Sequence, residues 1–397
     1  MANTTLTADI VLKEAHRVFE NNTPILQSLR RTYDDSYDAY GAKAGDTIRI
    51  KTPQRYYVST GKTITVQDNT ENVVSLARTT QKNIGMKFSS KELSLDIVEF
   101  SSLYISPAIN SLCSEVENDI ATTMYQSTYN ATTLPTDSLD RDDVLDAGVL
   151  LDNHSCPRDN NRHLVVNPAG QADLVSDLVG LFQQATAIGK QYMSGQMGTA
   201  LGFNMSMSQN LASHTTGGYN GAYVVTSIPT EGSDDLVIKT GTGTMTVGDV
   251  FTVAAVNSVN RVTGNSTGRV ACWVVTTAYS GGAGTVVVDP DFRASATDAY
   301  RTIDALPQAD AATTEIGTAS TAYPQNLAYH GESTAFGSCA LELPGNSNFE
   351  SQQKNNNVSI RLIKFYDGIN DDSYYRFDIL YGQVVVVPEW ICRIYGL

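Results

Sequence analysis

The residues best suited to bind a metal ion are His154, Cys156 and His163, because imidazole nitrogen and thiolate sulfur are common zinc ligands. A structural zinc site needs about four ligands, and the spacing of these residues fits no standard zinc motif. We therefore interpret them as ordinary loop residues. The sequence predicts no metal ion and no cofactor.

Other patterns resemble fragments of chemical sites. Asp367, Asp371 and Asp372 offer carboxylates to calcium, but their segment lacks the ligand pattern of a calcium-binding loop. Gly241-Thr-Gly243 lacks the following Lys-Ser/Thr pair that completes a phosphate-binding loop. Ser333 lacks the Gly-x-Ser-x-Gly pattern of a nucleophile elbow. The sequence gives no positive argument for catalysis, and we expect a protein that is not an enzyme.

Composition narrows the class of protein further. The chain has 397 residues and a net charge of −15, which argues against a dedicated nucleic-acid-binding protein with a basic surface. Its five cysteines have no paired spacing, so we expect them to be reduced and mostly buried. No secretory signal is evident, and the longest aliphatic run, Val384–Val387, is too short to span a bilayer. These features favour a protein that is assembled in the cytoplasm.

The longest predicted helix, Ser106–Tyr129, is the element around which the rest of the chain is organised. Ser106 is expected to cap it, and Pro107 is expected to occupy its first turn. Its apolar residues recur at the spacing of one buried helical face: Ile109, Leu112, Cys113, Val116, Ile120 and Met124. A long helix without catalytic residues favours a building element over an enzyme.

The amino-terminal segment Thr7–Arg31 is predicted to form an amphipathic arm of two helices, broken at Asn21–Pro24. Its apolar face either packs on its own domain or docks on a neighbouring molecule. We favour docking because of the segment that follows it.

Residues Gly45–Lys87 are predicted to form a long two-stranded β-hairpin. The segments Thr47–Lys51, Thr63–Gln67 and Asn83–Phe88 alternate between polar and apolar residues, and Asp68-Asn69 lies near a turn.

This hairpin has the opposite charge to the rest of the chain. Residues 43–87 contain eight basic and three acidic residues, a net charge of +5, which leaves −20 for the remainder. An extended hairpin is only marginally stable alone in water, and the acidic surface of an identical molecule would stabilise it. An ordinary solvated hairpin is the alternative. The residues predicted to contact a neighbouring molecule are Arg49, Lys51, Arg55, Lys62, Arg78 and Lys82.

Two further residues, Arg376 and Asp378, complete the predicted contacts. They lie two residues apart on a predicted strand and therefore on one face. They either pair with charges of the long helix or the hairpin, or lie on a solvated strand face.

The middle of the chain is predicted to mix helices and strands. Asp140–Leu151 has acidic residues in the first turn of a predicted helix, His163–Val166 is a short apolar strand, and Asn167-Pro168 begins a helix that continues through Leu181 and Phe182. This alternation is typical of an α+β or α/β fold.

From about residue 217 to 292 nearly every signal is β, with glycine-rich turns between short strands. Such spacing indicates a small β-barrel or sandwich inserted into the chain. The predicted strands are Tyr223–Ile228, Leu236–Thr240, Asp249–Val256, Arg269–Thr277 and Thr285–Val288.

The remaining segments return to a mixed pattern. Arg301–Thr321 is rich in Ala, Thr and Asp and is predicted to form a helix and a loop. Val358–Tyr366 and Tyr374–Val387 are predicted strands, joined by the acidic turn Asp367–Asp372.

The carboxy-terminal third contains an ordered set of segments: Asn326–His330, Leu341–Gly345, Ser359–Leu362, Tyr375–Gly382 and Pro388–Arg393. This set resembles the P-22-type coat proteins of tailed bacteriophages. The opening Leu6–Arg31 and the order of arm, basic hairpin, long helix and β insertion are also similar to that family.

The resemblance implies an α+β fold of the Hong Kong 97 type with an inserted β-barrel domain. The implied parts are an N-terminal arm (1–32), an extended loop that lies over a neighbour (33–88), a peripheral domain with the long helix (89–134), an axial domain (135–216), the inserted β-barrel (217–292), the return of the axial domain (293–340) and the last peripheral strands (341–397).

The resemblance also implies a function. It predicts a major capsid protein that self-assembles into pentamers and hexamers of an icosahedral shell, with a separate scaffolding protein and a portal as partners. The shell would hold double-stranded DNA without sequence-specific contacts. An encapsulin-like compartment and a glycan-binding surface protein remain as alternatives.

Overall fold

The computed structural model describes residues 8–31, 47–58, 61–63, 66–67, 71–89, 101–132, 138–179, 198–219, 223–343 and 349–396. The chain forms two compact units. The first contains Met1–Ile50, Val73–Ile120 and Thr334–Val384, and the second contains Lys51–Asn72, Ala121–Ser333 and Val385–Leu397. The predicted turn at Asp68-Asn69 and the helix continuation through Leu181 and Phe182 lie outside the described residues.

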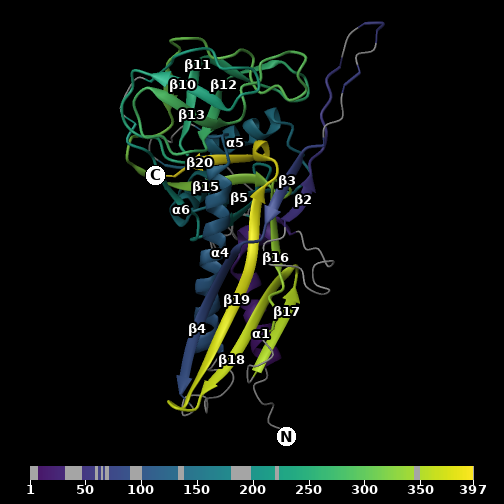
Figure 1. Ribbon diagram of the computed structural model, residues 1–397, viewed down its shortest axis with the longest axis vertical. Coiled ribbons are helices and arrows are strands. Elements are labelled where there is room, and N and C mark those ends of the chain that lie inside the picture. Colours follow the sequence, from purple (N-terminus) through teal and green to yellow (C-terminus); the bar gives the residue numbers. More distant parts are fainter. Residues whose placement is uncertain are drawn as a thin grey trace. The chain divides into compact units, whose positions relative to one another are not determined.

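The first unit is built on a six-stranded sheet whose long strands run beside one another in Figure 1. The strand order is β1-β16-β19-β18-β17, and β4 pairs with β19. The strands are β1 (Arg30–Arg31), β4 (Thr80–Ser89), β16 (Thr334–Cys339), β17 (Phe349–Asn355), β18 (Val358–Asp367) and β19 (Asp372–Val385). The two predicted strands around the acidic turn are confirmed as β18 and β19, whereas β17 was not predicted.

The amino-terminal helices pack on this same unit. They are α1 (Ala8–Asn21) and α2 (Pro24–Ser28), and the break between them is where the sequence predicted it. The apolar face of α1, including Val11, Ala15 and Phe19, is buried, and α1 contacts β17 and β18. That face is therefore used within its own unit, as in the alternative in which the arm packs on its own domain.

The long helix is α4 (Ser106–Gln126). All the apolar residues of the predicted stripe are buried, so its amphipathic pattern is confirmed. A π-helical turn, η3 (Ser101–Ile105), precedes it, so Ser106 continues a helical segment instead of capping one. Glu117, which follows the buried Val116, is also fully buried, and its carboxylate accepts a hydrogen bond of 2.9 Å from the backbone N–H of Ile25.

The predicted hairpin is only partly correct. β2 (Thr47–Lys51) pairs with β3 (Val73–Ala77) in a two-stranded sheet. The segment Asn83–Phe88 is a strand, but it belongs to β4 and is paired antiparallel with β19. Residues Thr63, Val66 and Gln67 are not in a strand. The alternation of β4 reflects a long strand of the main sheet, because alternation does not identify the partner strand.

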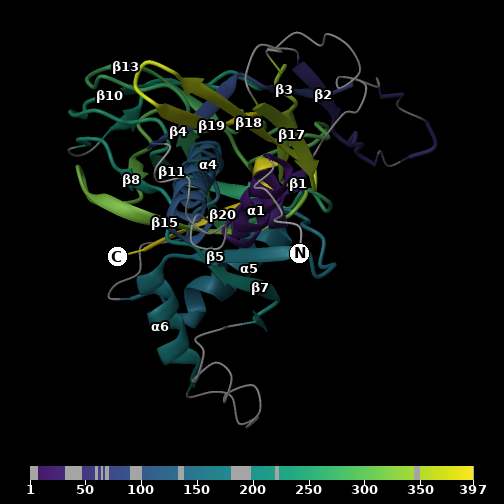
Figure 2. The same ribbon diagram turned by 90° about the horizontal axis from the view of Figure 1, so that it is seen from below.

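The second unit contains a sheet of order β20-β15-β5-β7-β6, with β8 paired to β15. Helices α5 and α6 share one apolar core with one face of this sheet, and Figure 2 shows them beside β5 and β7. These elements are α5 (Arg141–Asn153), β5 (Arg162–Val166), α6 (Pro168–Val179), β6 (Thr199–Ala200), β7 (Phe203–Met207), β8 (Ser213–Thr215), β15 (Ala322–His330), η4 (Pro388–Trp390) and β20 (Ile391–Tyr395).

The start of α5 follows directly from its sequence. The side chain of Asp140 accepts a hydrogen bond from the N–H of Asp143, and the side chain of Asp143 accepts one from the N–H of Asp140. This reciprocal capping satisfies backbone donors that the helix cannot pair itself. The predicted helix Asp140–Leu151 and strand His163–Val166 are confirmed.

The β-rich segment forms a further six-stranded sheet in the second unit, of order β14-β11-β12-β13-β10-β9. Its core contains Trp273, Phe251 and Phe292. The strands are β9 (Val224–Val225), β10 (Asp235–Lys239), β11 (Val250–Val259), β12 (Ser266–Val275), β13 (Gly284–Asp289) and β14 (Thr313–Glu315). Each predicted strand of this segment has a counterpart.

The helix predicted within Arg301–Thr321 is wrong. β14 pairs with β11, so the sheet of β9–β14 continues to Glu315, beyond the residue at which the predicted insertion ends. No helix forms between residues 301 and 321, all of which are described. The side chain of Thr302 donates to the carbonyl of Asp291 (2.8 Å), and Arg301 donates to three backbone carbonyls. Such bonds give the backbone an alternative to helix formation.

The carboxyl-terminal end of strand β12 (Trp273, Val274 and Val275) is buried on both of its faces. Ala271, Trp273 and Val275 point into the core of the inserted sheet. Val274, on the opposite face, belongs to a second cluster with Tyr129, Tyr323 and Tyr395, which lie outside the insertion. The inserted sheet and its surroundings in the second unit therefore share apolar packing.

Candidate functional site

The charged residues that are predicted to contact a neighbouring molecule lie in both units. Arg55 lies in a largely buried ion cluster of the second unit. One of its guanidinium nitrogens is 3.2 Å from a carboxylate oxygen of Glu389, and the other nitrogen contacts the second oxygen. Arg261 lies 3.0 Å from the same carboxylate. The charge of Arg55 is thus paired within the chain, and its predicted contact with a neighbouring molecule stays a prediction.

The charges around Glu389, in its cluster with Arg55 and Arg261, keep its carboxylate ionised. The side chain of Glu389 is 13% exposed and that of Arg261 is 5% exposed. Burial opposes ionisation, but the guanidinium groups of Arg261 and Arg55 outweigh it and hold the pKa of Glu389 below its usual value. A cavity of about 430 Å³ lies beside the cluster. The result is a fixed pairing of one carboxylate with two guanidinium groups.

Arg261 also ties the cluster to the loop between β13 and β14. Its guanidinium donates to the carbonyls of Tyr300 (3.3 Å) and Arg301 (2.7 Å) and to the hydroxyl of Tyr129 (3.3 Å). The guanidinium of Arg55 lies over the ring of Tyr300, 5.8 Å from its centre. A single cluster thus joins η4, the insertion and the segment before β3.

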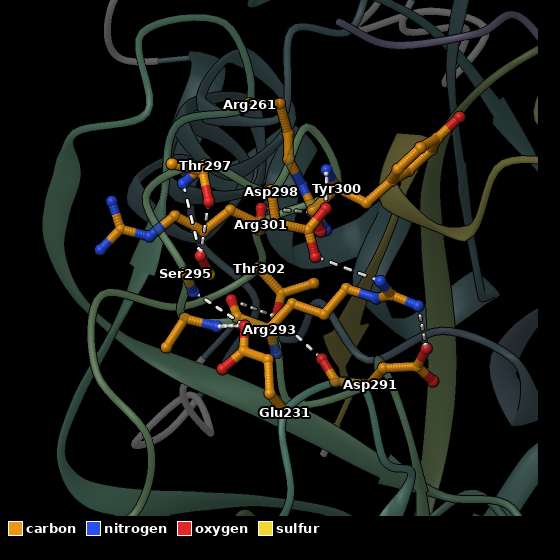
Figure 3. A network of polar contacts seen from close by, with 11 residues as sticks. Glu231, Arg261, Asp291, Arg293, Ser295, Thr297, Asp298, Tyr300, Arg301 and Thr302 are labelled. Atoms are coloured by element: carbon orange, nitrogen blue, oxygen red, sulfur yellow. Dashed lines mark hydrogen bonds and ion pairs between the residues drawn. The ribbon is translucent and has the colours of Figure 1, made fainter. Parts of the chain in front are cut away.

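The same loop is held at its base by Arg293, as Figure 3 shows. Its guanidinium bridges Asp291 (3.0 Å) and Asp298 (3.1 Å). One carboxylate oxygen of Glu231 accepts from the N–H groups of Ala294 (2.7 Å) and Ser295 (2.8 Å). The loop that contacts Arg261 is therefore fixed by its own polar contacts.

Lys82 is also paired within its own unit. Its ammonium group lies 3.2 Å from a carboxylate oxygen of Glu115 and 3.2 Å from one of Asp119, both on α4. Asp119 also accepts a hydrogen bond of 2.5 Å from the hydroxyl of Tyr381 on β19. Lys82 therefore takes part in a link between β4, α4 and β19, and its predicted contact with a neighbour stays a prediction.

Arg376 and Asp378 pair with each other, not with the long helix or the hairpin. Asp378 is fully buried and accepts from Arg376 at 2.9 Å and from Arg361 at 2.7 Å. Gln81 on β4 donates to the same carboxylate at 3.2 Å. The carboxylate of Asp378 is therefore buried and paired within its own unit, and its predicted contact with a neighbouring molecule stays a prediction.

The accessible basic residues of the predicted set are Arg49, Lys51 and Lys62. All three are exposed, whereas Arg78 is 3% exposed and therefore buried. Lys51 lies 2.8 Å from Glu71, but both side chains are about two-thirds exposed, so this pair contributes about 1 kcal/mol at most. These three residues remain candidates for contacts between molecules.

The other patterns of the sequence are accounted for by local contacts. His154 packs edge-on against Tyr129, with its pKa lowered to about 4 by burial, and His163 hydrogen-bonds to Asn161. In the described ranges, no group of three or more His, Cys, Asp or Glu side chains could hold a metal ion. No described helix is long and apolar enough to cross a membrane.

The acidic residues of the segment Asp367–Asp372 and the glycine at position 241 also have structural explanations. Asp372 pairs with Lys87 at 2.6 Å, and Asp371 accepts a hydrogen bond of 2.7 Å from Tyr366. Gly241 lies against Tyr223, so that a Cβ at this position would lie 2.3 Å from the tyrosine ring. A close approach of backbone to ring explains this glycine without a phosphate.

Arg393 is a buried charged residue that the sequence reasoning did not single out. It is fully buried, donates to the side chain of Gln325 (2.9 Å) and contacts the carbonyl of Gly248. Its guanidinium lies over the rings of Tyr125 (5.4 Å) and Tyr395 (5.1 Å). The apolar residues on both sides of Arg393 could have indicated a buried strand, but the charge of Arg393 argued against burial.

A second buried group links the sheet of β9–β14 to the rest of the second unit. Asp249 is 1% exposed and accepts hydrogen bonds from His214 (2.7 Å), the N–H of Gly217 (3.0 Å) and the N–H of Thr246 (2.6 Å). Burial and the adjacent carboxylate of Asp249 raise the pKa of Glu315 to about 8. Two carboxyl groups thus lie together where β8 and β14 connect the insertion to the unit.

Replacement of Glu315 by glutamine is expected to remove a pH dependence of stability. The folded-state pKa of about 8 exceeds the ordinary value of 4.5, so ionisation costs stability as pH rises from about 4.5 to 8. We expect Glu315→Gln to match the wild type at pH 4.5 and to exceed it by about 1–3 kcal/mol at pH 8.5. Urea unfolding across this range measures the difference.

The control for this prediction is Glu342→Gln, which neutralises an exposed side chain. It should change stability equally at both pH values. Parallel stability curves for the wild type and Glu315→Gln would contradict the prediction.

The chain matches one family model and several solved structures. The family model described as "P22 coat protein - gene protein 5" matches residues 1–394. A chain of Mycobacterium phage Che8 is 13% identical, with 94% of this chain and 91% of that chain covered and a TM-score of 0.44. A chain from the capsid of a native GTA particle is 7% identical, with coverages of 94% and 90% and a TM-score of 0.45.

A shorter match falls on part of the chain. The CUS-3 coat protein I-domain is 26% identical, covers 24% of this chain and 96% of its own, and has a TM-score of 0.21. A comparison with curated proteins gives no match.

Proposed function

The chain belongs to the P22 coat protein family, and on that premise we propose that its copies assemble into an icosahedral shell around the double-stranded DNA of a tailed bacteriophage. It is a major capsid protein, and its role in the family is structural. The match over residues 1–394 is the observation that carries the proposal, and it favours a coat protein over an encapsulin-like compartment or a glycan-binding protein.

We propose a Hong Kong 97-like organisation for the two mixed α+β units. The sheet of β4, β18 and β19 with α4 would be the peripheral domain, and the sheet of β5 and β15 with α5 and α6 would be the axial domain. The strands β9–β14 would close into the inserted β-barrel, and an apolar core around Trp273 supports this assignment.

The segment from β2 to β3 is proposed as the extended loop that lies over a neighbouring subunit. Besides its exposed basic residues, this segment has exposed apolar ones: Tyr56 is 59% exposed and Val58 is 94% exposed. Exposed apolar groups beside charges are typical of a surface that another molecule covers.

The proposed partners follow from the same role. Identical subunits would form pentamers and hexamers, guided by a separate scaffolding protein and completed by a portal. Assembly would take place in the host cytoplasm and yield the virion capsid. The net charge of −15 opposes close contact with DNA phosphates, so we expect the packaged DNA to be held without sequence-specific contacts.

Charge reversal on the extended loop is expected to impair assembly. The triple variant Arg49→Glu, Lys51→Glu and Lys62→Glu changes only exposed side chains, so the fold should persist. If the loop lies on an acidic neighbour, the yield of shells should fall by about ten-fold or more, because like charges then face each other. Negative-stain electron microscopy and sedimentation of assembly reactions measure this yield.

A matched control is the triple variant Lys13→Glu, Arg158→Glu and Lys239→Glu. It changes the net charge by the same amount on other described surfaces and should reduce the yield less. Equal loss in both variants would contradict the loop contact. If the wild-type chain formed only small particles with its scaffolding protein present, the shell function would be contradicted.

A further inference from the structure

The cavity beside the Glu389 cluster has room for a small molecule. Its volume of about 430 Å³ lies within the range of about 300–1,000 Å³ that is common for ligand pockets. All the residues that line it belong to the second unit. The charged ones are Arg261, Asp289, Asp291, Arg293 and Glu389. Three acidic and two basic residues therefore line one space.

Most of these charges are paired. The carboxylate of Glu389 is shared by the two guanidinium groups of its cluster. The guanidinium of Arg293 bridges Asp291 and Asp298, as Figure 3 shows. Three guanidinium groups thus pair with three carboxylates, and the carboxylate of Asp289 is in excess of these pairs.

Asp289 lies at the end of β13 and is partly buried. Its side chain lines the cavity and forms no hydrogen bond or salt bridge with a described residue. Burial and the carboxylates of Asp291 and Glu389 raise the pKa of Asp289 to about 6, although the charge of Arg261 opposes this rise. At neutral pH Asp289 is therefore mostly ionised in surroundings that disfavour its charge, and an additional cation would stabilise it.

The other walls of the cavity suit an organic cation. Tyr129, Pro290, Tyr300 and Pro388 line it and offer aromatic and apolar carbon to a ligand. An ammonium group is attracted both by a carboxylate and by the face of an aromatic ring, and an alkyl chain packs against apolar carbon. The cavity is also much wider than a bare metal ion requires. Its charge and its lining together favour an alkylammonium ion.

We propose that this cavity binds a primary alkylammonium ion of a few carbon atoms, whose N–H groups donate to the carboxylate of Asp289. Its carbon chain lies against the tyrosines and prolines of the wall. The site includes the end of β13, the start of η4 and Asn72 before β3, so a bound ion contacts three separate parts of the second unit. This binding goes beyond the shell function and does not require assembly.

Saturation-transfer NMR on the purified full-length chain tests the site. The probe is butylammonium, and butan-1-ol is its uncharged counterpart of similar size. A charge-assisted hydrogen bond contributes a factor of about ten or more to affinity, so butylammonium should bind at least about ten-fold more tightly than butan-1-ol at pH 7.5. Absence of saturable binding, or equal affinity for both probes, would overturn the proposal.

The variant Asp289→Asn identifies the carboxylate. It keeps the shape of the side chain and removes its charge, so the affinity for butylammonium should fall about ten-fold or more. The melting temperature should not fall, because the carboxylate has no direct partner to lose. Asp310→Asn is the control, since it removes the same charge from a side chain that is 74% exposed and should change the affinity by less than about two-fold. Equal affinities in the two variants would contradict a site at Asp289.

A pH series gives an independent measurement. Protons compete with the ligand for Asp289, which with a pKa of about 6 is about one-tenth ionised at pH 5 and almost fully ionised at pH 7.5. The other groups do not change charge in this range: guanidinium groups hold the pKa of Glu389 below its usual value, and burial lowers the pKa of His154 to about 4 and raises that of Tyr129.

The affinity of the wild type for butylammonium should therefore fall about ten-fold between pH 7.5 and pH 5. The Asp289→Asn variant should bind weakly at both pH values. A wild-type affinity that does not change with pH, or a variant that keeps the same pH dependence, would show that Asp289 does not hold the ligand.

Discussion

Replacement of Glu389 by alanine is expected to destabilise the protein by about 3–5 kcal/mol, the usual cost of removing one partner from a buried ion pair. The substitution leaves Arg261, which is 5% exposed, and Arg55 without their shared carboxylate. The uncompensated guanidinium groups would repel each other in a poorly solvated site. Chemical unfolding of the purified subunit measures the change.

A matched control for Glu389→Ala is Glu71→Ala. Glu71 also pairs with a basic residue, Lys51, but both side chains are about two-thirds exposed, so the loss should stay below about 1 kcal/mol. The double variant Arg55→Ala and Glu389→Ala should lose less than the sum of the two single variants, because the partners interact directly. A loss at Glu389 no larger than that at Glu71 would contradict the buried cluster.

Replacement of Arg393 is expected to have a similarly large effect. Arg393→Ala removes donors from the side chain of Gln325 and the carbonyl of Gly248 and leaves both without that partner in a buried site. Each unsatisfied group costs about 1–3 kcal/mol, so we expect a total loss of about 3 kcal/mol or more. Thermal and urea unfolding of the variant measure this loss.

Arg393→Lys distinguishes the geometry of the guanidinium from its charge. A lysine keeps the charge but lacks the planar set of donors that contacts Gln325 and lies over the rings of Tyr125 and Tyr395. We therefore expect this variant to recover less than half of the loss in Arg393→Ala. Full recovery by lysine would show that charge alone matters at this position.

Helices and strands with a regular apolar period could be predicted from the sequence, whereas the strands with which they pair could not. Helix α4 and the inserted strands were found because buried residues recur along them with the period of a helix or a strand. Strand β4 was also recognised, but it was assigned to the hairpin. Period alone does not tell which strand lies beside it, and its partner β19 is almost 300 residues away.

The candidate site was less predictable for a similar reason. The candidate contact residues are predicted from their charge, and the charge of a residue reveals neither whether it is buried nor which residue it pairs with. Arg55 meets Glu389, 334 positions away in the sequence, whereas Lys62 remains exposed. Arg393 was missed because charged residues are rarely buried unless tertiary contacts satisfy them. Only a three-dimensional structure separates basic residues that stabilise the subunit from those available to a neighbour.

The two-sided burial at the carboxyl end of strand β12 limits how freely the proposed insertion can be exchanged during evolution. Val274 packs with Tyr129, Tyr323 and Tyr395, which belong to the surrounding sequence. An insertion transplanted from a relative would meet this tyrosine-rich surface with its own side chains. Such a chimera should fold only if the recipient's tyrosines and the donor's strand match in volume, so the two parts are expected to be inherited together.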